Sequence, residues 1–110
     1  MAEAADLKRI ALSLPDTVAY PHFDRTAFKA ARTFVTLAAD GLSANFKFAP
    51  DEQELKCLVA PEIFTPVEGG WGRMGFTRGT LAAMTLADLQ AALSMAHAHA
   101  VKKPRAKRVR

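Results

Sequence analysis

Helical spacing of apolar residues predicts the first two helices of the chain. One stripe lies near the start of the sequence and consists of Leu7, Ile10, Ala11 and Leu14. Pro15 disfavours helical geometry at the residue before it, so this helix should end there. A second helix should begin at Pro50 and end before Pro61, and we expect its buried stripe to be Leu55, Leu58 and Val59.

A third helix is expected from Thr85 to about Val101. The Thr85 side chain can cap the first turn, and Asp88 stands three residues later, close to a capping box. The apolar stripe of this helix consists of Leu86, Leu89, Leu93 and Ala96. The residues that follow are too charged to pack, so the helix should fray near Val101.

Strand patterns occupy the segments between these helices. Residues 16–25 and 26–30 should be extended, and Pro21 makes the first of them an edge strand or an irregular run. Residues 33–37 and 42–48 flank Asp40-Gly41, a dipeptide typical of a hairpin turn. The second of these strands alternates strictly, so one face should pack, with Leu42, Ala44, Phe46 and Phe48 on it.

A further strand is expected over residues 71–77, where Met74 and Phe76 alternate with Arg73 and Thr77. On such a strand, Trp71 and Arg73 would point to the same side. The order of all these elements predicts one α+β domain over residues 1–101. It should have an N-terminal helix, a mainly antiparallel sheet with helices packed on one face, and a C-terminal helix.

Composition is consistent with one domain and limits its chemistry. Half of the 110 residues are apolar, which suffices for a core without disulfides or a structural metal. Cys57 is the only cysteine, so an intramolecular disulfide and a four-cysteine zinc site are excluded. The first residues carry charges where a signal peptide needs an apolar run, and no stretch approaches the ~18–20 apolar residues that span a bilayer. We therefore expect a reduced, cytoplasmic protein.

The net charge of +4 is unevenly distributed. Residues 1–101 carry nine basic and eleven acidic side chains, a net charge of −2. The other six basic residues lie in a tail over residues 102–110 that we expect to be disordered: Lys102, Lys103, Arg105, Lys107, Arg108 and Arg110. This tail would contact phosphates without sequence specificity. The alternative is a solvated tail that only aids solubility.

Two stretches resemble the motifs of a known family. Residues 14–29, which include Leu14-Pro15-Asp16-Thr17-Val18 and Tyr20-Pro21-His22-Phe23, resemble the opening motif of the MmcQ/YjbR family. Residues 64–77, a glycine-rich turn running into Trp71-Gly72, are similar to its second signature. The resemblance covers about residues 5–100; Asp24 replaces a common glycine and Phe76 a usual tryptophan. It implies a YjbR-like fold and a non-enzymatic DNA-binding protein.

Several basic and aromatic residues are candidates for contact with DNA or a ligand from the polar sheet face: His22, Arg25, Lys29, Lys47, Trp71, Arg73 and Arg78. Trp71 would either stack on a base or partner side chain, or pack on the sheet beneath Arg73. His22 would either contact a phosphate or order its own turn by bonding a backbone carbonyl. The alternative function is a protein-interaction or small-ligand module that uses the same face.

No catalytic residue, metal or cofactor is expected. His22 lacks an accompanying serine or cysteine nucleophile motif, and Cys57 should be a small buried hydrophobe. His97 and His99 would lie about 200° apart on a helix, so they cannot chelate one ion together. The glycines of residues 69–73 lack the spacing of a phosphate loop and should instead allow a tight turn. As partners we expect DNA, bound non-specifically, and neither a membrane nor a metal; a monomer is favoured.

Overall fold

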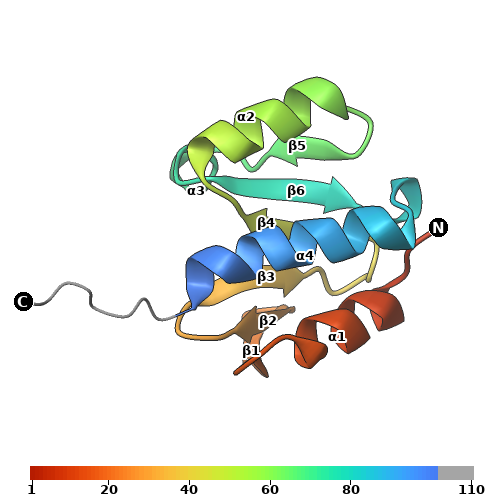
Figure 1. The fold of residues 1–110 in the computed structure, drawn as a ribbon, viewed down its shortest axis with the longest axis vertical. Coiled ribbons are helices and arrows are strands. Elements are labelled where there is room, and N and C mark those ends of the chain that lie inside the picture. The colour runs from red at the N-terminus through yellow and green to blue at the C-terminus, as the bar shows by residue number, and fades with distance from the viewer. Residues whose placement is uncertain (102–110) are drawn as a thin grey trace, which may run out of the picture.

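The computed structural model describes residues 1–101, and within them the chain forms a six-stranded sheet flanked by helices (Figure 1). In chain order the elements are α1 (Ala4–Ser13), β1 (Val18–His22), β2 (Arg25–Lys29), β3 (Thr33–Leu37), β4 (Ser43–Lys47), α2 (Pro50–Val59), β5 (Phe64–Pro66), α3 (Gly70–Arg73), β6 (Phe76–Thr80), the 3-10 turn η1 (Leu81–Ala83) and α4 (Leu86–Ala100). The predicted α+β class is confirmed. The predicted tail, residues 102–110, lies outside the described residues.

The strands lie in the order β1-β2-β3-β4-β6-β5, and every neighbouring pair is antiparallel. Strand β1 is at one edge, as Pro21 predicts, and β5, which ends at Pro66, is at the other. A proline is tolerated there because an edge strand does not use all of its N–H groups in the ladder. The placement of β6 beside β4 brings residues 76–80 next to residues 43–47.

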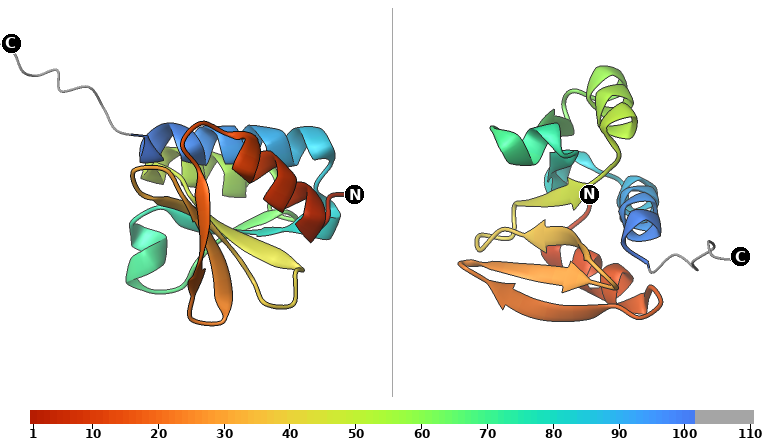
Figure 2. Two further views of the ribbon diagram at one scale, coloured as in Figure 1. Left: turned by 90° about the horizontal axis from the view of Figure 1, so that it is seen from below. Right: turned by 90° about the vertical axis from the view of Figure 1, so that its left-hand side faces the viewer.

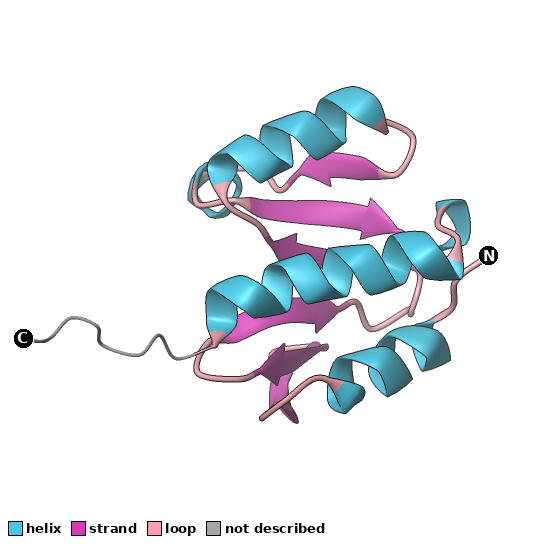
Figure 3. Cartoon of the chain, viewed as in Figure 1, coloured by secondary structure: helices cyan, strands magenta, loops and turns pink. Residues whose placement is uncertain are grey.

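Three helices, α1, α2 and α4, cover one face of the sheet, whereas α3 lies on the opposite side (Figures 1 and 2). Figure 3 shows these three helices in front of the strands. Between the layers lie fully buried side chains from both: Leu7, Phe28, Phe34, Phe46, Phe48, Leu89 and Leu93. Because the core lies on this side alone, the other face of the sheet is free to carry polar and aromatic groups.

Helix α4 begins where its capping residues predicted. The Thr85 hydroxyl oxygen accepts a hydrogen bond from the Asp88 N–H at 3.0 Å, and the Asp88 carboxylate accepts one from the Thr85 N–H at 2.9 Å. This is the predicted capping box, and the helix ends at Ala100, next to Val101, close to where it was expected to fray. Leu89, Leu93 and Ala96 are buried, while Leu86 is half-exposed in the first turn.

The hairpin predicted at Asp40-Gly41 is present. Gly41 has a φ of +74°, and the Leu42 N–H donates to the Asp40 carboxylate at 2.9 Å. Ala44 and Phe46, on β4, are buried as expected, and so is Phe48 just beyond it. Leu42 is exposed, contrary to expectation, because it lies in the turn rather than on the strand.

Helix α2 has the predicted bounds but faces the other way. The predicted buried stripe of Leu55, Leu58 and Val59 is exposed, and none of the helix residues is fully buried. The half-buried face instead contains Gln53, whose amide donates to the carbonyl oxygens of residues 72 and 76 at 3.0 and 2.9 Å. It also contains Lys56, whose ammonium lies 5.6 and 5.2 Å from the ring centroids of residues 48 and 64. Polar side chains with long apolar stems therefore make this contact.

The strand predicted over residues 71–77 is also wrong. The chain makes the single helical turn α3 at this point, and β6 begins only at Phe76. Two glycines explain the difference. A Cβ on Gly72 would lie 1.8 Å from the Val67 carbonyl oxygen, and Gly75, at a φ of +107°, passes equally close to the backbone of Phe48. The tight turn expected from the glycines of residues 69–73 is present, but it bends the segment away from the sheet.

Among the described helices, none combines the length and the apolar character that crossing a membrane requires.

Candidate binding site on the open sheet face

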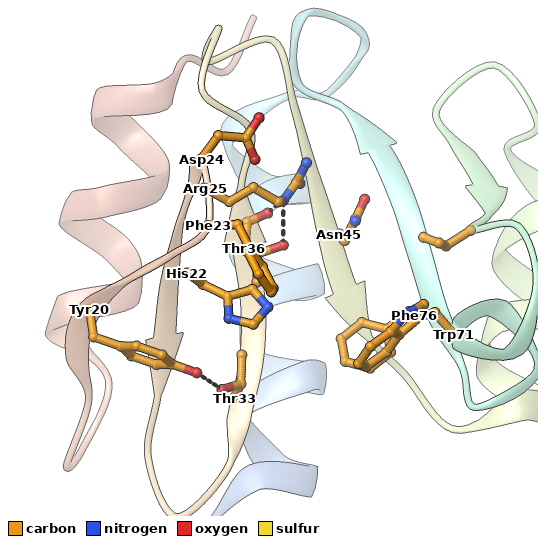
Figure 4. A pocket seen from close by; sticks show the side chains of 11 residues that line it. Tyr20, His22, Phe23, Asp24, Arg25, Thr33, Thr36, Asn45, Trp71 and Phe76 are labelled. Carbon is orange, nitrogen blue, oxygen red and sulfur yellow. Dashed lines mark hydrogen bonds between the residues drawn. The ribbon is translucent and has the colours of Figure 1, made fainter.

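The sheet face that α1, α2 and α4 leave uncovered, here called the open face, carries a pocket of about 460 Å³ (Figure 4). Strand alternation determines which side chains point there. Because Ala44 and Phe46 face the core, Asn45 and Lys47 face the open side of β4. The cross-strand register then places Arg78 opposite Asn45, and Phe76 opposite Lys47.

One wall of the pocket comes from β1 and the turn that follows it. Tyr20 and His22 alternate on β1, with ring centroids 6.4 Å apart, and the His22 and Phe23 rings meet edge to face at 4.8 Å. The Tyr20 hydroxyl shares a hydrogen bond with the Thr33 hydroxyl on β3. The ammonium of Lys29 lies 5.1 Å from the centroid of the Tyr20 ring. This aromatic wall is therefore anchored to the neighbouring strands.

Phe23 is the most unusual residue of this wall. It lies in the two-residue turn between β1 and β2, has a φ of +59° and is 93% exposed. A positive φ is strained for a residue with a bulky side chain. An exposed phenyl group also forgoes the ~1.5–3 kcal/mol that its burial would contribute. The two-residue hairpin loop requires the positive φ, but stability of the fold does not account for an exposed phenyl group at that position.

The opposite wall comes from α3 and the start of β6. Trp71 is 58% exposed, and its ring meets that of Phe76 edge to face at a centroid distance of 5.3 Å. Gln53 of α2 fixes this wall from behind, since its amide bonds the carbonyl oxygens of Gly72 and Phe76. Val67 completes the lining on this side.

The floor between the walls is polar and includes Thr36 of β3 and Asn45 of β4. Arg25 is locked onto it, because its Nε donates to the Thr36 hydroxyl at 2.8 Å and a terminal nitrogen donates to the Thr36 carbonyl at 3.0 Å. Burial lowers the pKa of the Arg25 guanidinium, and the carboxylates of Asp24 and Asp40 oppose that shift. A guanidinium remains protonated at neutral pH, so the floor carries one fixed positive charge.

The structure brings together only some of the predicted contact residues. His22, Arg25 and Trp71 line the pocket, and Lys47 and Arg78 share its face. Arg73 ends the helical turn α3, where positions two apart lie about 200° apart, so it does not share a face with Trp71 as predicted. Several lining residues were not among the predicted contact residues: Tyr20, Phe23, Asp24, Thr33, Thr36, Asn45, Val67 and Phe76. For Asn45 the signal was available, because strict alternation already placed it beside Lys47.

The remaining histidines and the cysteine have contacts of their own. His97 is buried, with its Nε2 2.8 Å from the Pro15 carbonyl oxygen, and His99 Nε2 lies 2.7 Å from a Glu52 carboxylate oxygen. Cys57 is half-buried against the core, and burial raises the pKa of its thiol. Within residues 1–101, no three histidine, cysteine or acidic side chains are grouped so that they would hold a metal ion.

Comparison with known proteins relates the fold to one solved structure. No protein-family model and no curated protein matches the chain. The structure is similar to that of the Deinococcus radiodurans protein DR2400, described as a DUF419 domain, with a TM-score of 0.79 and 19% sequence identity over 94% of this chain and 81% of that chain. DUF419 is the MmcQ/YjbR-like family. The chain therefore shares the fold of a DUF419 domain.

Proposed function

We propose that the chain is a non-enzymatic, cytoplasmic binding protein of the MmcQ/YjbR type whose pocket receives a planar aromatic group. The proposal rests on one observation, the two aromatic walls that flank a polar floor on the open face (Figure 4). Phe23 belongs to one wall and Trp71 to the other, and both side chains are exposed to solvent. Concave sites with aromatic walls and a few convergent polar groups are typical of ligand binding, and the volume lies within the usual ~300–1,000 Å³.

The polar groups of the pocket support binding rather than catalysis. In a catalytic triad, a hydrogen-bonded partner orients the histidine that acts as the general base. Within residues 1–101, the His22 side chain makes no hydrogen bond to a carboxylate or hydroxyl group that could orient it. In the same described part of the chain it also makes no hydrogen bond to a backbone carbonyl, which was the alternative role for His22 in its own turn. Neither a serine nor a cysteine is among the described lining residues. Cys57 lies on α2, which packs over the other face of the sheet.

Trp71 offers a direct test, because it is the only tryptophan of the chain. Its fluorescence therefore reports on the pocket without interference from other indole groups. Titration with a panel of planar aromatic compounds should quench or shift the Trp71 emission, and amide NMR shifts should map the change to the pocket. Phe23→Ala should weaken binding by about tenfold, since stacking on one aromatic side chain contributes ~1–3 kcal/mol.

Leu58→Ala is the matched control, because Leu58 is an exposed apolar residue on α2, on the covered side of the sheet. This variant should bind as the wild-type protein does. The proposal fails if no compound of the panel perturbs Trp71, or if the two substitutions weaken binding equally.

DNA binding over the same face is a second candidate function. Lys47 and Arg78 lie on the open face beside the pocket, and Lys29 lies over the ring of Tyr20. These side chains would contact phosphates while Trp71 stacks on a base. Their arrangement supports single-stranded DNA more than duplex DNA, because the aromatic walls require an unpaired base.

Anisotropy titrations with single-stranded and duplex DNA across a salt series would test this candidate. Full-length protein should be compared with a 1–101 truncation. If all six tail charges reach phosphates of duplex DNA, the slope of log K against log salt should differ between the two proteins by about −5, from roughly −0.9 per contact; for single-stranded DNA the difference should be about −4, from roughly −0.7 per contact. Binding by the full-length protein alone would exclude the sheet face as the DNA contact.

A further inference from the structure

The amide of Asn45 is the most informative polar group of the pocket floor. It is half-buried, and within residues 1–101 its side chain makes no hydrogen bond. A side-chain amide offers two N–H donors and an acceptor oxygen on one planar edge. Leaving these groups unpaired under a bound ligand would be unfavourable, so a ligand that fills the pocket must present complementary donors and acceptors. A plain hydrocarbon ring does not.

The walls determine the shape of that ligand. Trp71 and Phe76 stand on one side of Asn45, and His22 and Phe23 stand on the other (Figure 4). A flat ring inserted between them has aromatic contact on its faces and the floor at its edge. The volume of about 460 Å³ is large enough for one such ring with a short substituent.

Three basic residues, Arg25, Lys47 and Arg78, lie on the same sheet face as Asn45. Arg25 is fixed at the floor by its two hydrogen bonds to Thr36. Arg78 is the direct cross-strand neighbour of Asn45, so the Cβ atoms of the two residues lie about 5 Å apart. Lys47 is two residues from Asn45 on β4 and therefore points the same way. An anionic group attached to the ring would meet these cations at the edge of the pocket.

We propose that the pocket binds a nucleobase that carries a phosphate, with Asn45 contacting the base edge, the two aromatic walls its faces, and Lys47 and Arg78 the phosphate. This inference rests on the proposed function and specifies its ligand. An amide is the side chain that pairs in bidentate fashion with a base edge. The shared chemistry is that of a free nucleotide and of a nucleotide within a single strand.

The charges distinguish this ligand from the cationic groups that aromatic cages also bind. Such cages attract quaternary ammonium groups through the electron-rich faces of their rings. In this pocket, the carboxylate of Asp24 lies beside the guanidinium of Arg25 and offsets its charge. Within residues 1–101, the cations of this face without such a partner are Lys29, whose ammonium already lies over the Tyr20 ring, and Lys47 and Arg78 on the neighbouring strands. On the side of Lys47 and Arg78, a cationic ligand would therefore meet like charges, whereas a phosphate would meet opposite ones.

The decisive comparison is between a nucleotide and a ligand that differs only at the ring edge. Calorimetric titration of the full-length protein with the four common nucleoside monophosphates should be set beside 1-naphthyl phosphate, which is flat and anionic but has no hydrogen-bonding edge. At least one nucleotide should bind about tenfold tighter than 1-naphthyl phosphate. Asn45→Ala should remove that preference without changing the affinity for 1-naphthyl phosphate.

Ser43→Ala is the control, because Ser43 lies on the same face of β4, is equally half-buried and does not line the pocket. Amide NMR spectra of both variants would establish that each is folded. The nucleobase inference fails if 1-naphthyl phosphate binds as tightly as every nucleotide, or if Asn45→Ala weakens both ligand types equally. In either case the binding of a planar aromatic group stands. If neither nucleotides nor 1-naphthyl phosphate bind, the nucleobase inference fails, and the proposed function fails with it only if the uncharged aromatic compounds of the panel also leave Trp71 unperturbed.

A short single strand of the preferred base distinguishes the two sources of the nucleotide. Tighter binding of the strand, lost with salt and weakened by Arg78→Ala, assigns the site to a polynucleotide. Equal affinity per base for strand and monophosphate assigns it to a free nucleotide. A strand that competes with neither the nucleotide nor 1-naphthyl phosphate restricts the site to the free form.

Discussion

Replacement of Phe23 distinguishes the contribution of this residue to folding stability from its contribution to ligand binding. This residue has a φ of +59° in the turn between β1 and β2, and its phenyl group is 93% exposed. Phe23→Gly relieves the backbone strain and removes the ring. Phe23→Ala removes the ring but keeps a Cβ in the strained conformation. The difference in stability between the two variants therefore measures the effect of the backbone conformation at this position.

The magnitude follows from three contributions. The left-handed conformation costs a residue with a Cβ about 1–2 kcal/mol, which glycine avoids. Glycine loses an additional ~0.5–1 kcal/mol of backbone entropy on folding. Loss of the edge contact with His22 removes ~0.5 kcal/mol at this exposed position. We therefore expect Phe23→Gly to be at least as stable as the wild-type protein, and about 1 kcal/mol more stable than Phe23→Ala.

Urea denaturation followed by far-UV circular dichroism measures this difference, and ligand titration of the same variants measures the function. Both substitutions should weaken binding of the aromatic ligand by about tenfold, while only one of them lowers stability. If Phe23→Gly loses more than ~1 kcal/mol relative to the wild-type protein, the phenyl group stabilises the fold. The exposed wall would then need no ligand to explain it.

Three further substitutions test how the pocket and the core are held. Gln53→Ala removes the two hydrogen bonds of 3.0 and 2.9 Å that hold α3. At ~0.5–1.5 kcal/mol for each bond, urea denaturation should show that the free energy of unfolding falls by about 1–3 kcal/mol. An equal loss in Glu54→Ala, a variant of the exposed neighbouring residue, would contradict this. Gly72→Ala puts a Cβ 1.8 Å from the Val67 carbonyl oxygen, so the Trp71 emission should shift and stability should fall by about 1–3 kcal/mol, whereas an unchanged spectrum would show that α3 tolerates the side chain. Because burial raises the pKa of the Cys57 thiol, the folded state binds more protons than the unfolded state above the ordinary thiol pKa, and stability should fall as pH rises through that range; Cys57→Ala should flatten this decline, and an identical slope in both proteins would refute it.

The elements predicted correctly are those with a complete local signal. The turn at Asp40-Gly41 needs a residue at positive φ, and only glycine supplies it without strain. The start of α4 needs a partner for its free N–H groups, and Thr85 and Asp88 supply one within four residues. In both cases the interaction that specifies the structure is contained in the short segment itself, so the sequence suffices.

The orientation of α2 was not predictable from periodicity. Its apolar stripe, Leu55, Leu58 and Val59, is more hydrophobic than the face that packs. What favours the observed face is the amide of Gln53, which bonds carbonyl oxygens of residues 72 and 76 that lie 19 and 23 positions along the chain. Such a bond depends on the position of another element, and hydropathy does not encode it.

The pocket depends on residues 71–77, which were predicted to form a strand and instead begin with the helical turn α3. If residues 71–77 formed a strand, the Trp71 side chain would lie on the sheet itself, next to the residues adjacent to it in the sequence. Gly72 and Gly75 have no Cβ, so the backbone of other segments packs directly against them. The chain therefore leaves the sheet at α3 and rejoins it as β6. This detour places Trp71 across the floor from His22 and Phe23, which come from the far edge strand and its turn (Figure 4). The second wall therefore requires both glycines, and the ligand affinity of the site should follow their substitution even though neither is among the pocket-lining residues.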